Sequence, residues 1–163
     1  MPAPVFTETI QLCVVVRDLE QAMATYVHDY GIGPWDIYDF DPTTVRDMRE
    51  SGQPVERSWR LALAMVGTVQ WELIQPLDEE STYARFLAEK GEGVHHVGVA
   101  TPSYADTIAT LREKGHDVLL GGAYNGVNFA YLSTDRDLGL ITEIFDGTPG
   151  ADQKPDAVYP PPI

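Results

Sequence analysis

Residues 91–99 read Gly-Glu-Gly-Val-His95-His96-Val-Gly-Val, which places a histidine pair at the start of an apolar strand. A similar pattern occurs 85 residues earlier, where Gln11 corresponds to His96. Near the end of each half, Trp71-Glu72-Leu73-Ile74 corresponds to Thr142-Glu143-Ile144-Phe145 at an offset of 71 residues. The sequence therefore predicts a duplicated chain whose first half holds an extra 14 residues.

Each half is predicted to be a β-α-β-β-β module, because apolar residues alternate or run together in the strands and recur at helical spacing between them. The helices have side-chain caps at Asp18 and Ser103 and glycine terminators at Gly31 and Gly115. The expected strands are 7–16, 58–66 and 68–74 in the first half, and 94–100, 127–132 and 138–145 in the second.

Three other segments have less regular patterns. A short helix within 76–90 is expected to link the halves. The extra chain falls within 36–57, where mixed polar residues predict a mobile loop, with a short helix around 44–50. After Asp146 the chain is rich in proline and glycine, so it is expected to be a tail that is disordered or laid across a neighbour.

Composition limits the classes of function. The 163 residues, 44% of them hydrophobic, fit one compact domain. The net charge of −14 argues against nucleic acid or an anionic membrane as a partner. The sequence lacks an 18-residue apolar run and a signal-peptide pattern, so a cytoplasmic location is expected. Cys13, the single cysteine, is expected to be a small buried hydrophobe.

Gln11, Glu72, His96 and Glu143 occupy two pairs of equivalent positions and are the candidate metal ligands. A carboxylate in an apolar strand is costly to bury unless it is paired, protonated or bound to a cation. Two carboxylates facing one cavity would also repel each other. A divalent cation between the modules would offset the cost of burying the two carboxylates and would remove the repulsion between them. His95 should alternate to the opposite face and serve a structural role.

The donor set predicts the type of cofactor. Imidazole, carboxylate and amide oxygen suit Zn, Ni, Co, Mn or Fe, whereas thiolate sites need more cysteines than the single one in this chain. A homodimer is expected, because short modules with open sheets leave strand edges to cover. The candidates for lining the pocket are Tyr38, Trp59, Arg60, Trp71 (the weakest candidate), Tyr124, Asn125, Asn128 and Tyr131.

Over about residues 7–147 the chain resembles the vicinal oxygen chelate superfamily, the glyoxalase and bleomycin-resistance fold. The stretch 76–82 and the sequence 91–96 are similar to methylmalonyl-CoA epimerase, whereas the ligand order Gln, Glu, His, Glu is similar to zinc-type glyoxalase I. The resemblance implies an α+β fold of paired βαβββ modules whose curled mixed sheets surround a metal. It also implies a single domain at 1–147, with modules at 7–75 and 93–147 joined by a linking helix at 76–92, and a tail at 148–163.

The resemblance further implies a divalent-metal-dependent isomerase or lyase that removes a proton α to a carbonyl of a small molecule and gives a metal-stabilised enolate. Glu143 would be the principal base, and Glu72 a ligand and second base. Three alternatives remain: a methylmalonyl-CoA epimerase, whose further acid would fall near Trp59 or Arg60; a non-catalytic drug-binding resistance protein; and a ring-cleaving dioxygenase with two histidines and one carboxylate. The arginines that would attract a polyanion such as CoA are Arg46, Arg49, Arg57 and Arg60.

Overall fold

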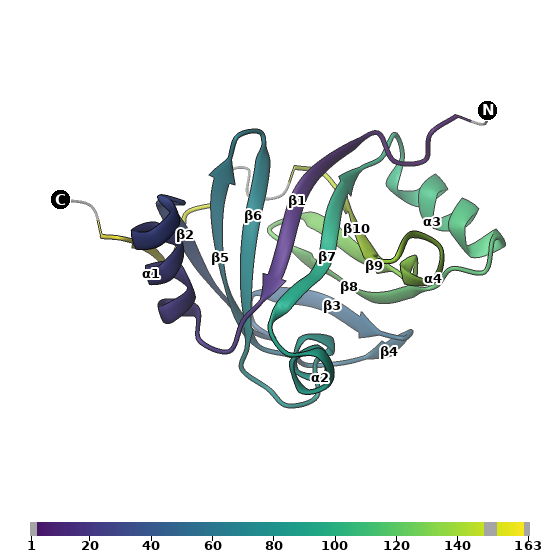
Figure 1. Cartoon of the computed structure of the whole chain (residues 1–163). Helices are drawn as coiled ribbons and strands as arrows, with labels where there is room; N and C mark the ends of the chain where they lie inside the picture. Colours follow the sequence, from purple (N-terminus) through teal and green to yellow (C-terminus); the bar gives the residue numbers. More distant parts are fainter. Residues whose placement is uncertain (1–2, 149–152, 162–163) are drawn as a thin grey trace.

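A computed structural model of the chain describes residues 3–148 and 153–161. It shows an α+β fold built on one mixed sheet, which curls without closing (Figure 1). The strand order in the sheet is β11-β2-β5-β6-β1-β7-β10-β9-β8-β3-β4. The predicted fold class is confirmed.

Two halves of the same design meet at the centre of the sheet. The first half contains β1 (Glu8–Val15), α1 (Leu19–Tyr30), β2 (Trp35–Phe40), β5 (Trp59–Val66) and β6 (Val69–Pro76). The second contains β7 (Gly93–Ala100), α3 (Tyr104–Glu113), β8 (Val118–Tyr124), β9 (Val127–Leu132) and β10 (Ile141–Asp146). Because β1 pairs antiparallel with β7, the order β2-β5-β6-β1 in one half is mirrored by β7-β10-β9-β8 in the other.

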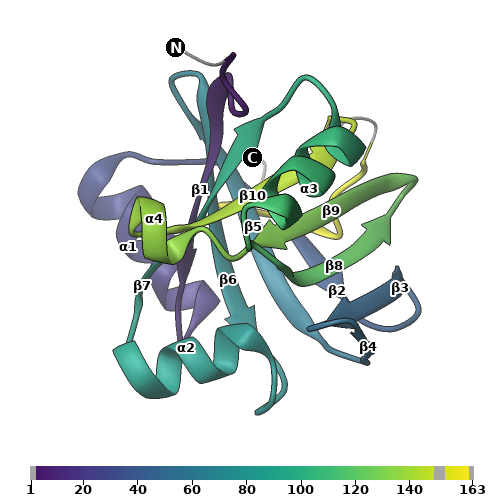
Figure 2. The ribbon, with the colours of Figure 1, turned by 90° about the vertical axis from the view of Figure 1, so that its right-hand side faces the viewer.

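The helices begin where the sequence predicts. Asp18 accepts a hydrogen bond from the backbone N–H of Gln21, and Ser103 accepts one from that of Asp106. The linking helix α2 (Thr82–Lys90) is capped in the same way by Ser81. Helix α1 packs on β5 and β6, and α3 lies on the outer side of β10 (Figure 2). Both helices therefore cover the outside of the sheet and leave its inner face to the space between the halves.

The prediction for 36–57 was wrong, because this segment is largely strand. It forms β2, β3 (Val45–Glu50) and β4 (Gln53–Pro54), and β3 pairs with β8 of the other half. A register shift between Arg46 and Arg49 interrupts the β3–β8 ladder, which explains why period-two alternation is hard to find there. Strands β2 and β8 were also not located from the sequence, and Leu138 belongs to the short helix α4 (Asp135–Leu138), not to a strand.

The described part of the tail lies on its own chain. Strand β11 (Ala157–Tyr159) pairs antiparallel with β2, which corrects the expectation of disorder or of a neighbour's surface; residues 149–152, 162 and 163 of the expected tail lie outside the described residues. The outer edge of each half is thus covered within the chain, β2 by β11 and β8 by β3. The open edges that motivated the homodimer prediction are therefore paired.

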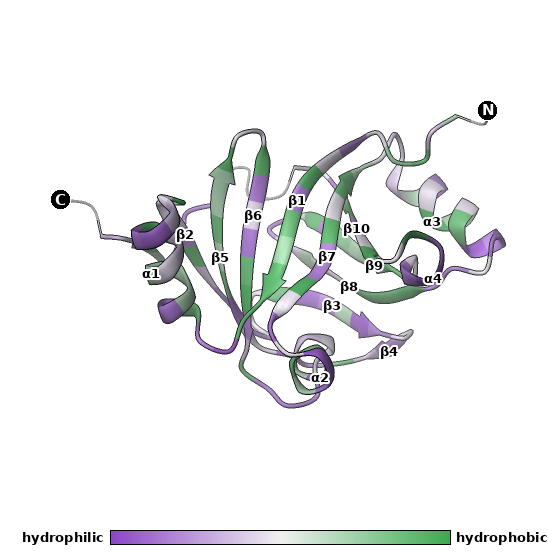
Figure 3. Ribbon diagram, viewed as in Figure 1, coloured by the Kyte–Doolittle hydropathy of each residue, from purple (hydrophilic) through white to green (hydrophobic). Residues whose placement is uncertain are grey.

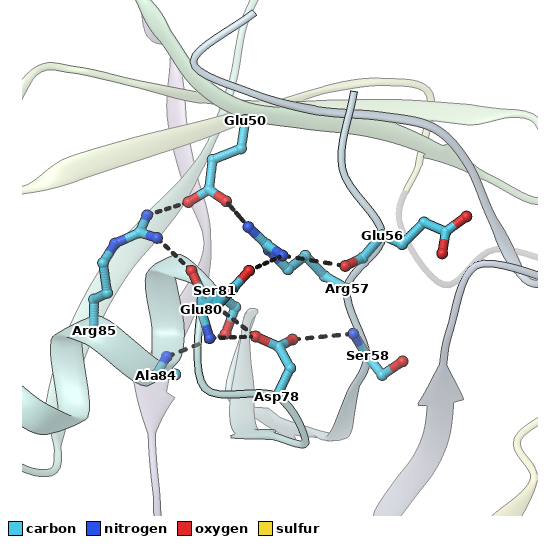
Figure 4. Close-up of polar contacts among 9 residues, drawn as sticks. All are labelled: Glu50, Glu56, Arg57, Ser58, Asp78, Glu80, Ser81, Ala84 and Arg85. Atoms are coloured by element: carbon cyan, nitrogen blue, oxygen red, sulfur yellow. Dashed lines mark hydrogen bonds and ion pairs between the residues drawn. The ribbon is translucent and has the colours of Figure 1, made fainter. Parts of the chain in front are cut away.

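A network of ion pairs fixes the β3–β4 hairpin to α2 (Figure 4). Glu50, at the end of β3, pairs with Arg57 at 3.2 Å and with Arg85 of α2. Arg57 also lies 3.3 Å from Glu80, just before that helix. Asp78 accepts hydrogen bonds from the backbone N–H groups of Ser58 and Ser81. These contacts hold the inserted hairpin against one end of the curled sheet.

Three apolar clusters form the core. One packs α1 against the first half, and another packs α3 against the second. The third lies inside the curl and joins β1, β5, β6, β9 and α2 with Val45 and Met48 of the inserted hairpin. Polar segments interrupt the hydrophobic central strands (Figure 3).

No helix in 3–148 or 153–161 is long and apolar enough to cross a membrane.

Candidate metal centre

Strand register brings the predicted ligands together at the centre of the sheet. Gln11 lies on β1, Glu72 on β6, His96 on β7 and Glu143 on β10, and these four strands are adjacent in the order β6-β1-β7-β10. Cys13 pairs with both Glu72 and His96, while Gln11 pairs with Gly98, which in turn pairs with Glu143. Residues 11 and 13 share a face of β1 because side chains alternate along a strand. The duplication therefore produces a cluster within one chain.

All four side chains are buried, with at most 6% of the residue exposed. His96 Nε2 lies 2.9 Å from Glu143 Oε2 and 3.3 Å from Glu72 Oε2. Gln11 Nε2 donates a hydrogen bond to Gln70 Oε1 at 2.9 Å. The amide oxygen of Gln11, Oε1, has no hydrogen-bond donor in the described part of the chain and can therefore coordinate a cation. The structure thus brings all four predicted residues to one site.

A glycine allows Gln11 to occupy this position. A Cβ placed on Gly98 would lie 2.7 Å from the Cβ of Gln11 and 3.3 Å from its Oε1, closer than carbon atoms normally approach. Gly98 occupies the place in the second half that Cys13 occupies in the first. The two modules therefore differ where their central strands meet, and the difference makes room for the amide.

The arrangement leaves polar atoms unsatisfied. Among the described residues, Gln11 Oε1, Glu72 Oε2 and His96 Nε2 are buried without a hydrogen-bond partner, because the close contacts of His96 with the carboxylates lack hydrogen-bond geometry. An unpaired buried polar atom is unfavourable, and a buried carboxylate more so. Three neighbouring electron-pair donors without partners fit a bound cation.

Electrostatics agree with this interpretation. Burial raises the pKa of Glu143 to about 7, although nearby His96 acts in the opposite direction. Burial alone would lower the pKa of His96, but Cys13 and Glu143 outweigh burial and hold it well above its usual value. The cluster therefore attracts a positive charge, which a proton or a metal cation supplies.

The structure corrects the prediction for His95. The β1–β7 pairing passes from Cys13–His96 to Val14–Val94, so His95 is the extra residue of a bulge and alternation is broken there. Both histidine rings are buried, and His95 Nδ1 lies 3.0 Å from His96 Nδ1. Burial, followed by the charges of His96 and Lys90, lowers the pKa of His95 to about 3, so its ring is neutral. His95 therefore contacts the candidate ligand directly.

Cys13 is a donor that sequence reasoning set aside. Its sulfur, a carboxylate oxygen of Glu72 and a ring nitrogen of His96 lie within 4.8 Å of one another. Burial raises the pKa of this thiol, while His96 acts in the opposite direction. The thiol is buried as predicted, and its sulfur also lies close enough to Glu72 and His96 to be considered as a further donor. Its place beside His96 in the register could not be seen before the strands were paired.

A pocket with a volume of about 70 Å³ opens onto the carboxylates. Gln11, Glu72 and Glu143 lie in its wall, and most of the remaining wall is aromatic or aliphatic. The aromatic residues include Tyr38, Phe40, Trp59, Tyr124, Phe129 and Tyr131. Both halves and Gln153 of the tail contribute to this wall.

Four of the eight pocket candidates from the sequence line this pocket: Tyr38, Trp59, Tyr124 and Tyr131. Arg60, Trp71, Asn125 and Asn128 do not. Arg60 pairs with Glu20 and Asp39 on the outside, and Trp71 packs on Tyr26 of α1. Phe40, Tyr83, Phe129 and Phe145 were missed. For Phe40, Phe129 and Phe145 the signal was present, since each lies two residues from a residue that had been singled out.

Comparison with known families identifies the fold. The family model described as Glyoxalase/Bleomycin resistance protein/Dioxygenase superfamily matches residues 10–131, which is more than half of the chain. The chain belongs to this superfamily. The chain is also 30% identical over 103 residues to the uncharacterized protein YqjC of Bacillus subtilis (strain 168), covering 60% of this chain and 71% of that protein.

Several solved structures have the same fold. A hypothetical protein from Bacillus halodurans C-125 superposes with a TM-score of 0.68 at 21% identity, covering 90% of this chain and 98% of that one. Methylmalonyl-CoA epimerase from Mycobacterium tuberculosis superposes with a TM-score of 0.64 at 20% identity, covering 91% and 93%. The epimerase from Streptomyces coelicolor gives 0.61 at 23%, covering 86% and 94%. At these identities the likeness shows the fold.

Proposed function

We propose that the chain is a divalent-metal-dependent isomerase or lyase of the glyoxalase and epimerase type, which removes a proton α to a carbonyl of a small molecule. The observation that carries the proposal is the buried cluster of Gln11, Glu72, His96 and Glu143 with its unsatisfied donor atoms. These four residues would hold Zn, Ni, Co, Mn or Fe. When bound, the cation supplies Lewis-acid stabilisation of negative charge that develops on the substrate carbonyl oxygen.

Glu143 is the proposed principal base. Its carboxylate borders the pocket and is held 2.9 Å from His96 Nε2. A base works best when its pKa lies near the working pH, and burial shifts the pKa of Glu143 in that direction. Glu72 reaches the same pocket from the other half of the chain. A proton taken by one carboxylate could therefore be returned by the other, which is what isomerisation or epimerisation requires.

His95 is a proposed positioning residue for this site. A neutral imidazole has one ring nitrogen that accepts and one that donates. With Nε2 directed to Thr82 Oγ1 at 3.4 Å, Nδ1 of His95 is placed to accept from Nδ1–H of His96. That contact would leave Nε2 of His96 unprotonated and available to a cation.

The test combines metal analysis with solvent deuterium exchange. Purified protein, loaded with Zn²⁺ or Ni²⁺, is incubated in D₂O with a panel of α-hydroxy ketones, hemithioacetals and thioesters, and exchange at the α carbon is followed by NMR. We expect exchange that EDTA abolishes and metal restores. Glu143→Gln should keep the fold and lose at least 100-fold in rate, consistent with the usual size of acid–base catalysis. Glu8→Gln, an exposed carboxylate on β1, is the matched control.

Other outcomes would overturn the proposal. Unchanged exchange in Glu143→Gln would remove this residue from the role of base. Metal-free protein that binds aromatic drugs without exchange would favour the drug-binding alternative, which the aromatic wall also fits. A ring-cleaving dioxygenase is less compatible, because the cluster offers one histidine and two carboxylates.

A further inference from the structure

The wall of the pocket carries no positive side chain. In the described parts of the chain, the residues that line it include no lysine, arginine or histidine. Its charged members are Glu72 and Glu143, and a divalent cation would balance them. An anionic group that entered this pocket would be buried without a counter-charge, which is strongly unfavourable.

Three of the four arginines considered from the sequence are engaged elsewhere, and Arg46 does not line the pocket. Arg57 pairs with Glu50 and Glu80 near α2 (Figure 4), and Arg60 pairs with Glu20 and Asp39 on the outside of the sheet. Arg49 donates to the backbone carbonyl of Gly52 in the β3–β4 turn. None of these side chains lines the pocket, so they do not offer the pocket a site for a phosphate or carboxylate.

One buried donor atom in the pocket wall has no hydrogen-bond partner among the described residues. Trp59 is 2% exposed and lines the pocket, and its Nε1–H is buried without a hydrogen-bond acceptor among the described residues. The rings of Phe40 and Tyr83 pack on it at centroid distances of 5.2 and 5.6 Å and hold its orientation. Because the indole nitrogen can only donate, it requires an acceptor that the protein does not supply.

Trp59 lies at a distance from the carboxylates. In the β5–β6 ladder Trp59 pairs with Pro76, whereas Leu63 pairs with Glu72. Four residues along a strand correspond to roughly 13 Å. The pocket therefore has an acidic end and a largely aromatic end, where Trp59 contributes a buried indole N–H.

We infer that the pocket takes an uncharged carbonyl compound bearing an apolar ring, whose far end carries an oxygen that accepts from Trp59 Nε1–H. The identity of the reacting end rests on the proposed function, whereas the far end is set by the aromatic wall and by Trp59. A substrate with a free carboxylate or phosphate in the pocket is excluded by the same chemistry.

The first test uses two ligands that differ in charge at the far end. They are 2-hydroxyacetophenones with a para-carboxamide or a para-carboxylate, which have nearly the same shape and the same vicinal oxygens. Calorimetric titration of protein, both as purified and loaded with Zn²⁺, should give a Kd at least 10-fold lower for the amide. Equal or tighter binding of the carboxylate would overturn the inference of an uncharged substrate.

The second test concerns the donor. Wild-type protein should bind the para-acetyl compound at least fivefold more tightly than the para-isopropyl compound, and Trp59→Phe should remove this preference. Trp71→Phe, which alters an indole that faces α1, should retain it. If Trp59→Phe kept the same preference, the indole N–H would not donate a hydrogen bond to the ligand, and Trp59 would contribute only apolar contacts. If Trp59→Phe does not fold, NMR spectra of the wild-type protein provide the test. One indole N–H resonance should move downfield when the acetyl ligand binds and should not move when the isopropyl ligand binds. Identical indole N–H spectra with the two ligands would contradict the inference.

The two proposals can fail separately. Binding preferences of the expected kind without deuterium exchange would refute the proposed reaction and leave the ligand class intact. Exchange without these preferences would support the reaction and refute the ligand class.

Discussion

At the scale of the residue, single positions decide whether the cluster can form. Gly98 leaves the space that Gln11 fills, and the bulge at His95 turns two successive histidines toward the interior. Neither residue is predicted to be a ligand, yet each determines where a ligand lies. The identity of the donors can be read from the sequence, whereas their mutual approach depends on these local departures from a regular sheet.

Gly98→Ala should disturb the site more than the fold. Its Cβ would meet that of Gln11 at 2.7 Å, so the amide must move, at a cost of about 1–3 kcal/mol of overpacking. Thermal unfolding should show a lower midpoint, and metal titration a weaker Kd. Gly93→Ala on the same strand meets nothing within 4 Å and is the control. Equal behaviour of the two variants would contradict the role given to Gly98.

At the scale of the element, two added strands complete the duplicated sheet. Strand β3 pairs with β8 and strand β11 with β2, so inserted and terminal segments cover the outer edges. Exposed strand edges favour pairing with other chains. This covering was not predicted, because polar and proline-rich segments show little periodicity.

Removing residues 153–163 should expose the edge of β2. We expect the shortened chain to self-associate with rising concentration, whereas the full chain does not change its state over the same range. Sedimentation velocity measures this directly. A shortened chain whose sedimentation is as independent of concentration as that of the full chain would show that β11 does not protect this edge.

The Glu50 network should stabilise the β3–β4 hairpin. The Glu50 side chain is 9% exposed and holds two arginines, so Glu50→Gln leaves them partly unpaired. We expect a loss of about 1–3 kcal/mol in the free energy of unfolding, measured in urea. Glu80→Gln in the same network, where the side chain is 81% exposed, should cost less than about 1 kcal/mol. Equal losses would contradict the importance of burial.

At the scale of the whole molecule, the candidate site joins the two halves. The four ligands come from both halves, so a bound cation should stabilise the folded chain relative to the unfolded one. At 100 times its Kd, a metal should add about 2.7 kcal/mol, or very roughly 5–10 °C in Tm for a chain of this size.

Scanning calorimetry with and without Zn²⁺ tests this expectation. Glu72→Gln with Glu143→Gln should remove most of the shift, and Glu8→Gln should retain it. A shift of the same size in the double variant would place the cation elsewhere.

The sequence by itself determined the duplication, the helix caps and the four polar residues that lie in otherwise apolar strands, because these are properties of spacing along the chain. It did not determine β2, β3, β8 or β11, the contact between His95 and His96, the approach of Cys13 to the cluster, or the unpartnered indole of Trp59 in the pocket wall. Those features arise only when strands far apart in sequence pair in a particular register. Pairing energy and burial across the sheet, not local preference, select that register.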